Sequence, residues 1–445
     1  MDKPPLHVAE PAAPLNFVGS RLRSMLRALW EGFRRSLTTN GLGRQFWTYL
    51  AAASLFNTGM FIFFFLYNLF LLDYGYTERF LGQVRSANAL GGIAGAIPAG
   101  ILAQRFGLRS AMLLYLVLVV LFSASLALFV SSALQLCLAF LASAAAIAWS
   151  VCTLPAVAQL TTEQNRSFGF SVNTASGIGL GVVSSLAGSR LPASLARIVP
   201  TATSGQLKQE ALLVACGIIA FAVWPASRLR LGPLPASEKK LYPRNPFVFR
   251  FLAAMCVWSF ATSAFSPFFN AYCAKYLRMP LGQIGVAFSA SQLSSMLAIV
   301  AVPLLFRKVG LVTGITFAQI AAAASLGLLA RMSAASGAAA VYVIYTAFLW
   351  ISEPGMFTLL MNRVEASERS SASALNLLVM SLSGAIAAPL AGGSFARYGY
   401  PAVLGVTAVV TLTAACLFRL LVGRELLPGA QPVLKEAPAS RFVGL

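Results

Sequence analysis

Charged residues are scarce in this sequence. Only 10% of its 445 residues are Asp, Glu, Lys or Arg, whereas soluble domains carry about 25%. Hydrophobic residues make up 58%, and the mean hydropathy is +0.76. Because too little polar surface is available to cover a water-facing globule, the composition excludes a soluble protein and places the chain in a lipid bilayer.

Residues that carry enzyme chemistry are also few. The sequence contains one histidine, His7, and no Gly-x-x-x-x-Gly-Lys-Ser/Thr loop that could hold a nucleotide phosphate. No cluster of carboxylates or nucleophiles stands out between the apolar segments. These absences argue against a hydrolytic enzyme and against an ATP-driven pump contained in this chain, and no cofactor is expected.

The cysteines show no Cys-x-x-Cys spacing, which a metal or redox pair would require. Each of them falls inside or at the end of an apolar run, so we interpret them as small packing residues and expect no metal site. They are Cys137, Cys152, Cys216, Cys256, Cys273 and Cys416.

Long apolar runs dominate what is present. Runs of roughly 18 to 25 residues are long enough, as helices, to cross the ~30 Å hydrocarbon layer of a membrane. The short alternating strands of a porin-like barrel are absent. We therefore expect an all-α integral membrane protein with twelve transmembrane helices, at about 46–72, 80–102, 110–131, 134–160, 167–188, 209–227, 248–276, 281–306, 311–331, 338–361, 370–396 and 400–422.

The net charge of +20 is explained by membrane topology rather than by nucleic acid. If the amino terminus is cytoplasmic, the inner segments hold 24 Lys and Arg, the outer loops hold 8, and Arg85 lies within a helix. This bias predicts that both termini face the cytoplasm. The expected location is the bacterial inner membrane, and no nucleic acid partner is expected.

Polar segments divide the chain. A basic, proline-rich stretch at 228–247 is the expected linker between two six-helix bundles, at 46–227 and 248–423. Cytoplasmic tails are expected at 1–45 and 424–445.

The N-terminal tail contains a basic amphipathic pattern. On a helix, Leu22, Met25 and Leu29 would share an apolar face, opposite Arg23 and Arg27. Such a helix suits a lipid bilayer with an anionic inner leaflet. The alternative is a partly ordered tail.

One spacing relates the two halves. At a shift of 203 positions, Arg105 falls on Lys308 and Gly107 falls on Gly310, again between two apolar runs. A period this long indicates two similar halves rather than a solenoid of short repeats. The functional site is therefore expected between the halves.

Uncharged polar residues inside the apolar runs are candidates for a substrate cavity. Asn68 and Asn270 occupy equivalent places in the first helix of each half, so we expect them to face one another across a central cavity. The alternative is that each bonds a neighbouring helix. Further candidates are Asn57, Asn88, Asn173, Gln292 and Asn376. Such a lining suits a moderately apolar organic molecule better than a densely charged one.

Two charged residues lie at membrane depth, where ionisable groups are costly unless they are paired or hydrated. Glu353 stands beside Pro354, and it could bind and release a proton or cap an interrupted helix. Arg85 could attract an anionic substrate, pair with Asp73 or Glu78, or extend to the outer head groups.

The segment from Gly100 to Arg109 resembles the signature of the major facilitator superfamily between helices 2 and 3. Residues Gly100, Leu102, Ala103, Arg105, Gly107 and Arg109 match it, whereas Gln104 replaces an acid and Leu108 replaces a basic residue. Gly100 is expected to let helices cross closely, and Gly107 to supply a tight turn. In the family this loop is a cytoplasmic gate, so the resemblance implies a weaker gate here because Gln104 carries no charge.

The resemblance implies that two six-helix bundles rock around a site near the middle of the membrane. We expect a secondary transporter that moves a small organic solute by alternating access, coupled to a proton or another ion, and working as an exporter and a monomer. Two alternatives remain open. One is a metabolite importer or uniporter, and the other is a non-transporting sensor or scaffold on the same fold.

Overall fold

The computed structural model describes residues 41–232, 245–365 and 368–423, and every regular element within them is a helix. The predicted amphipathic segment of the N-terminal tail, most of the linker and the C-terminal tail lie outside these residues.

The first half of the chain forms one bundle. Its helices are α2 (Arg44–Asp73), α3 (Glu78–Phe106), α4 (Leu108–Leu128), α5 (Ser132–Leu160), α6 (Arg166–Leu195), α7 (Ser204–Phe221) and the short α8 (Val223–Ala226) that continues α7.

The second half forms the other bundle. It comprises α9 (Pro246–Phe265), a broken helical segment through Ser266–Phe268, α10 (Phe269–Ala271) and Tyr272–Tyr276, then α11 (Leu281–Val309), α12 (Leu311–Leu329), α13 (Ala335–Arg363) and α14 (Arg369–Gly423).

The long α14 is two membrane spans joined by a turn. Its backbone leaves helical geometry at Gly399, where φ is 76° and ψ is 168°. Eleven described helices are long and apolar enough to cross a membrane, and the division of α14 makes twelve spans. The prediction of an all-α protein with twelve transmembrane helices is confirmed.

The repeat that relates the two halves at a shift of 203 positions is also seen in the backbone. Gly107 ends α3 with φ 83° and ψ 149°, and Gly310 ends α11 with φ 80° and ψ 155°. An L-residue with a Cβ rarely adopts this positive φ, so glycine is needed at both turns. The tight turn expected at Gly107 is confirmed, and its repeat at Gly310 shows that the two halves share one local design.

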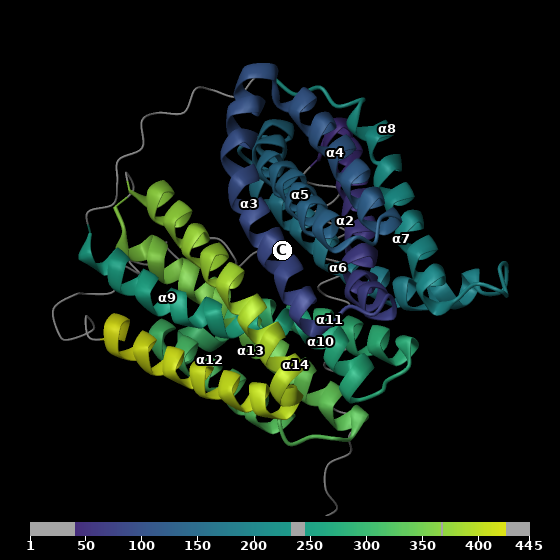
Figure 1. Cartoon of the computed structure of the whole chain (residues 1–445). Coiled ribbons are helices and arrows are strands. Elements are labelled where there is room, and N and C mark those ends of the chain that lie inside the picture. The colour runs from purple at the N-terminus through teal and green to yellow at the C-terminus, as the bar shows by residue number, and fades with distance from the viewer. Residues whose placement is uncertain (1–40, 233–244, 366–367, 424–445) are drawn as a thin grey trace, which may run out of the picture.

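The two bundles form a V. In Figure 1 they converge where α3 crosses α14, and they splay apart at the ends that carry the Gly107 and Gly310 turns. The positive-inside bias predicts that the splayed ends face the cytoplasm. We call these the predicted cytoplasmic ends, and the converging ends the predicted outer ends.

Glycines allow close helix crossings within the first bundle. A Cβ on Gly91 would lie 2.1 Å from the carbonyl oxygen of Phe140, and one on Gly95 would lie 2.3 Å from that of Ala144. The expectation that Gly100 serves such a crossing is wrong, because a Cβ there would meet nothing within 4 Å. The close approach of α3 to α5 thus ends before the signature turn begins.

Candidate substrate cavity and gates

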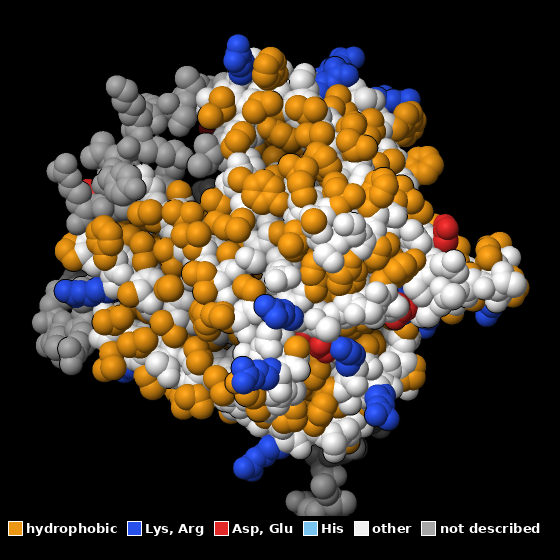
Figure 2. All heavy atoms as spheres, viewed as in Figure 1, with side chains coloured by type: hydrophobic (Ala, Val, Ile, Leu, Met, Phe, Trp, Pro, Cys, Tyr) orange, Lys and Arg blue, Asp and Glu red, His pale blue; other side chains and the backbone are white. Residues whose placement is uncertain are grey.

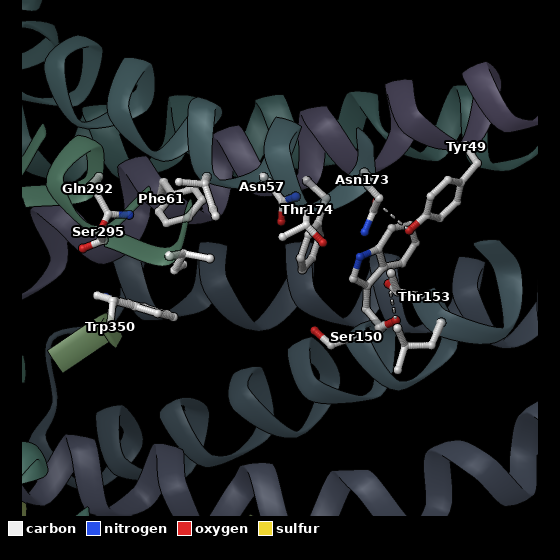
Figure 3. Close-up of a pocket in the computed structure, with 17 residues that line it drawn as sticks. Tyr49, Asn57, Phe61, Ser150, Thr153, Asn173, Thr174, Gln292, Ser295 and Trp350 are labelled. Atoms are coloured by element: carbon white, nitrogen blue, oxygen red, sulfur yellow. Dashed lines mark hydrogen bonds between the residues drawn. The ribbon is translucent and has the colours of Figure 1, made fainter. Parts of the chain in front are cut away.

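A cavity of about 450 Å³ lies between the halves. Its walls come from α2, α5 and α6 of the first bundle and from α11 and α13 of the second (Figure 3). On each helix the lining residues lie near the midpoint or toward the predicted cytoplasmic end. The cavity therefore occupies the depth that a carrier uses to hold its solute.

Aromatic rings form much of the wall. Phe56 and Trp149 stack with ring centroids 5.0 Å apart and an interplanar angle of 30°. Tyr49 and Phe61 line the cavity from α2, and Trp350 lines it from α13 in the other bundle. Figure 3 shows Trp350 and Tyr49 toward opposite ends of the cavity. Such rings can hold a flat apolar group by contact with its faces.

Amide and hydroxyl groups complete the wall, and no charged side chain of the described residues lines it. The Tyr49 hydroxyl donates to Oδ1 of Asn173 over 3.1 Å, which orients the Asn173 amide so that its NH₂ group remains a donor. Asn57 and Gln292 add further amides from α2 and α11 (Figure 3). The site can therefore exchange hydrogen bonds with a solute but offers it no counter-charge.

Three of the predicted cavity residues line this space, namely Asn57, Asn173 and Gln292. The other five are not among its lining residues. Asn88 and Arg85 are half-buried on α3, and Asn376 is buried on α14 with Nδ2 3.5 Å from the sulfur of Met380. Asn68 and Asn270 are buried near the predicted outer ends.

Asn68 and Asn270 bind across the interface between the halves instead of facing a cavity. Nδ2 of Asn68 donates to the carbonyl oxygen of Pro267 over 2.8 Å, and Nδ2 of Asn270 donates to that of Phe65 over 2.9 Å. Each amide thus reaches a carbonyl three residues before its counterpart. This reciprocal pair ties the first helix of one half to that of the other and excludes solute between them.

An ion pair reinforces the same closure. Nζ of Lys275 lies 2.9 and 3.0 Å from the two carboxylate oxygens of Glu78, and the Tyr400 hydroxyl donates to Glu78 over 3.0 Å. Close backbone contacts continue it, since a Cβ on Gly82 would lie 2.4 Å from the carbonyl oxygen of Ala388. These residues seal the predicted outer ends. The sequence carries no signal for Lys275 or Tyr400, because nothing in their local pattern distinguishes them from other residues at helix ends.

The alternative that Arg85 pairs with Asp73 or Glu78 is wrong in this state. Asp73 binds Lys208 of α7, and Glu78 binds Lys275. Within the described part of the chain Arg85 forms no ion pair.

Glu353 lies one helical turn from Trp350, toward the predicted cytoplasmic end of α13. Its side chain is half-buried, and no hydrogen bond or ion pair joins it to another described residue. It lies outside the set of cavity-lining residues. An unpaired carboxyl group at this depth is free to change its protonation when water reaches it.

Comparison with known sequences identifies the family. The sequence profile of the Major Facilitator Superfamily matches residues 2–186 and 49–388, which together cover most of the chain. The chain belongs to this superfamily. It is a multi-pass membrane protein and a secondary transporter of small solutes, not an enzyme. Comparison with curated protein sequences gives no significant match.

Solved structures of major facilitator transporters share the fold. The nucleoside transporter NupG aligns with a TM-score of 0.69 at 14% identity, covering 85% of this chain and 99% of its own. The xylose transporter XylE from E. coli, in an inward open conformation, aligns at 0.67 and 12%, covering 84% and 95%. A bacterial homologue of the human lysosomal transporter Spinster, inward-facing and unoccupied, aligns at 0.69 and 13%, covering 88% and 100%.

The polar contacts that join the major facilitator signature to other described residues lie within its own half. Arg109 donates to the carbonyl oxygen of Ser227, and the guanidinium carbon of Arg105 lies 5.5 Å from the ring centroid of Phe106. Gln104 is exposed and has no hydrogen bond to a described residue. The two halves are therefore apart at the predicted cytoplasmic ends and packed together at the predicted outer ends (Figure 1).

Proposed function

We propose that this transporter carries a neutral small organic solute with a flat apolar part and a few hydrogen-bonding groups, in exchange for protons that bind Glu353. The observation that supports the solute class is the cavity of about 450 Å³, which the described part of the chain lines with aromatic rings and amides and with no charged side chain.

The cavity chemistry favours a neutral solute because a buried ion without a partner loses its hydration and gains nothing in return. The stacked Phe56 and Trp149, together with Trp350, would cover an apolar face. The amides of Asn173 and Gln292 would favour solutes that form hydrogen bonds with them, because a buried amide without a hydrogen-bond partner raises the free energy of the complex.

The names of similar structures agree with this class. Nucleosides and D-xylose, the solutes named for two of them, are neutral molecules rich in hydrogen-bonding groups. At 12–14% identity these structures share the fold of the chain, so the argument for the solute rests on the lining residues.

Glu353 is the proposed proton carrier. It is half-buried, it has no partner among the described residues, and it lies one turn from Trp350 of the cavity wall. In the state that is open to the cytoplasm, water would reach the carboxyl group and exchange its proton. After the gates switch, the same group would exchange with the other side, which links proton movement to solute movement.

Export is the proposed direction. The two bundles splay apart at the predicted cytoplasmic ends (Figure 1), and an exporter must load its solute from this side. Import or uniport is the second candidate. Glu353 is not among the residues that line the cavity, and a uniporter needs no proton-binding group beside its solute.

Flux through the purified, full-length protein in proteoliposomes tests this function. A library of neutral and charged solutes is measured with and without a pH gradient, for the native chain, for Glu353→Gln, and for Glu365→Gln. Glu365 is an exposed carboxylate just beyond the end of α13, so its substitution removes the same charge at another site.

We expect neutral solutes to move against their gradient when a pH gradient is applied. In Glu353→Gln this accumulation should fall to the level without a gradient, while solute exchange continues; Glu365→Gln should behave as the native chain. Retained pH-driven transport in Glu353→Gln would remove this residue from the mechanism. If protons and solute move in the same direction, the proposed exchange is wrong and import is favoured over export. A solute that binds without any flux would favour the sensor alternative.

A further inference from the structure

A second cavity lies at the predicted cytoplasmic end of the first bundle, on the side away from the substrate cavity. It measures about 960 Å³ and is bounded by the start of α2, the start of α4, the short α8 and the residues that follow α8. We call it the arginine groove, because its walls include Arg44, Arg109, Arg228 and Arg230, and no acidic residue lines it among those that the structure describes.

The backbone around the groove is held in place by polar contacts. Arg109 donates to the carbonyl oxygen of Ser227, and the backbone N–H of Arg230 donates to Oε1 of Gln45 over 3.0 Å. The guanidinium carbon of Arg228 lies 3.9 Å from the ring centroid of Trp224. These contacts organise the groove but do not neutralise it, since none of the four arginines pairs with a described acidic residue.

Four guanidinium groups in one concave site call for an anion. Their planar donors match the oxygens of a phosphate, and several arginines around one phosphate share its charge. The neighbouring groups are of a different kind. Trp47 and Trp224, which line the groove, are 42% and 63% exposed, and Phe221 on the preceding turn is 73% exposed. Exposed tryptophans beside arginines are typical of the boundary between head groups and acyl chains.

The surface agrees with this boundary. In Figure 2 basic side chains lie along the top edge of the first bundle, above a flank rich in hydrophobic side chains. The positive-inside bias assigns that edge to the cytoplasmic leaflet, whose anionic lipids attract arginine.

The adjoining segments of the chain itself are poor occupants. Residues 1–40 and 233–244 each contain more Lys and Arg than Asp and Glu, so neither brings the negative charge that the groove lacks.

We propose that the arginine groove binds the phosphate head group of an anionic phospholipid from the cytoplasmic leaflet. The phosphate would bridge Arg44 at the start of α2 and Arg109, directly after the signature turn, to Arg228 and Arg230 at the start of the linker. The acyl chains would lie along Phe221 and Trp224.

Lipid retention by the full-length protein tests this assignment. The protein is loaded with mixtures of phosphatidylglycerol and phosphatidylcholine, and bound lipid is counted by native mass spectrometry. Arg44→Gln and Arg230→Gln are compared with Arg307→Gln, which removes an exposed arginine on the same predicted membrane side outside the groove.

We expect the native chain to prefer phosphatidylglycerol, and each groove substitution to lower its affinity about fivefold, since an arginine near an anionic membrane contributes about 1 kcal/mol. Arg307→Gln should leave the preference unchanged. Equal retention of the two lipids, or equal effects of Arg307→Gln and Arg44→Gln, would overturn the proposal.

Two further measurements distinguish other occupants. Displacement of the lipid by inorganic phosphate at comparable concentration would assign the groove to a soluble anion. A gain in bound phosphatidylglycerol after deletion of residues 1–40 would assign the groove to the chain's own tail. Neither measurement depends on transport, so these results are independent of the proposed solute and of Glu353.

Discussion

Asparagine has two different roles in this protein, although its chemistry is the same in both. The amide of Asn173 lines the cavity, whereas the amides of Asn68 and Asn270 donate to backbone carbonyl groups of the opposite half. A buried amide must find partners, and the surface that packs against it decides whether those partners are protein or solute.

Substitution of Tyr49 tests whether its hydrogen bond to Asn173 positions the solute. Tyr49→Phe removes the hydrogen bond to Oδ1 of Asn173 without changing the ring. We expect KM for the transported solute to rise about fivefold at unchanged maximal rate, because a neutral hydrogen bond contributes about 1 kcal/mol and this one orients a binding group. Flux measured against solute concentration reports both quantities.

Tyr74→Phe is the matched control. The Tyr74 hydroxyl also bonds an amide, Oε1 of Gln209 at 3.0 Å, but near the predicted outer end and away from the cavity. If both substitutions raise KM equally, the Tyr49–Asn173 pair does not position the solute.

Among the helices, the crossing of α3 and α14 determines how tightly the predicted outer ends can close. A Cβ on Gly392 would lie 2.3 Å from the carbonyl oxygen of Glu78, which leaves no room for a side chain. Small residues let backbones approach in a membrane, where packing rather than the hydrophobic effect holds helices together.

Gly392→Ala should therefore open the outer gate, and Gly393→Ala should not, because a Cβ on Gly393 would meet nothing within 4 Å. Overpacking costs about 1 to 3 kcal/mol, so the open fraction should rise roughly five- to one-hundredfold. The readout is labelling from the outer side of a cysteine at Ser150, an exposed cavity residue, after replacement of the six native cysteines. Equal labelling of the two variants would show that this crossing does not limit closure.

In the whole molecule the two halves meet at the predicted outer ends and lie apart at the predicted cytoplasmic ends. The Glu78–Lys275 pair and the reciprocal asparagines join the outer ends, whereas among the described residues the polar contacts of the signature at the other end stay within its own bundle. We expect these two regions to act as the outer and inner gates. Alternating access requires these two gates to have similar free energies, so that small differences decide which is closed.

Gln104→Asp tests this balance. An acid at position 104 restores the charge that the family signature carries, and we expect it to favour the state closed at the cytoplasmic ends. Labelling of the Ser150 cysteine from the cytoplasmic side should slow, whereas Gln104→Asn, which stays neutral, should leave it unchanged. Equal labelling of the Asp and Asn variants would show that the charge at this position has no role in the gate.

The sequence by itself determined the membrane location, the twelve spans, the division into two halves and the glycine turns. These features depend on local properties, namely the length of an apolar run and the backbone freedom of Gly107 and Gly310. The family signature added the expectation of a carrier with a gate.

Only the tertiary structure decided which polar residues face the cavity, which of them join the two halves, and at which ends the halves meet. Glu78 and Lys275 are 197 residues apart, and Asn270 and Phe65 are 205 apart. Such contacts depend on the rotation of each helix and on the tilt of one bundle against the other. Apolar periodicity does not specify either of these, because lipid and protein interior are both apolar surroundings for a membrane helix.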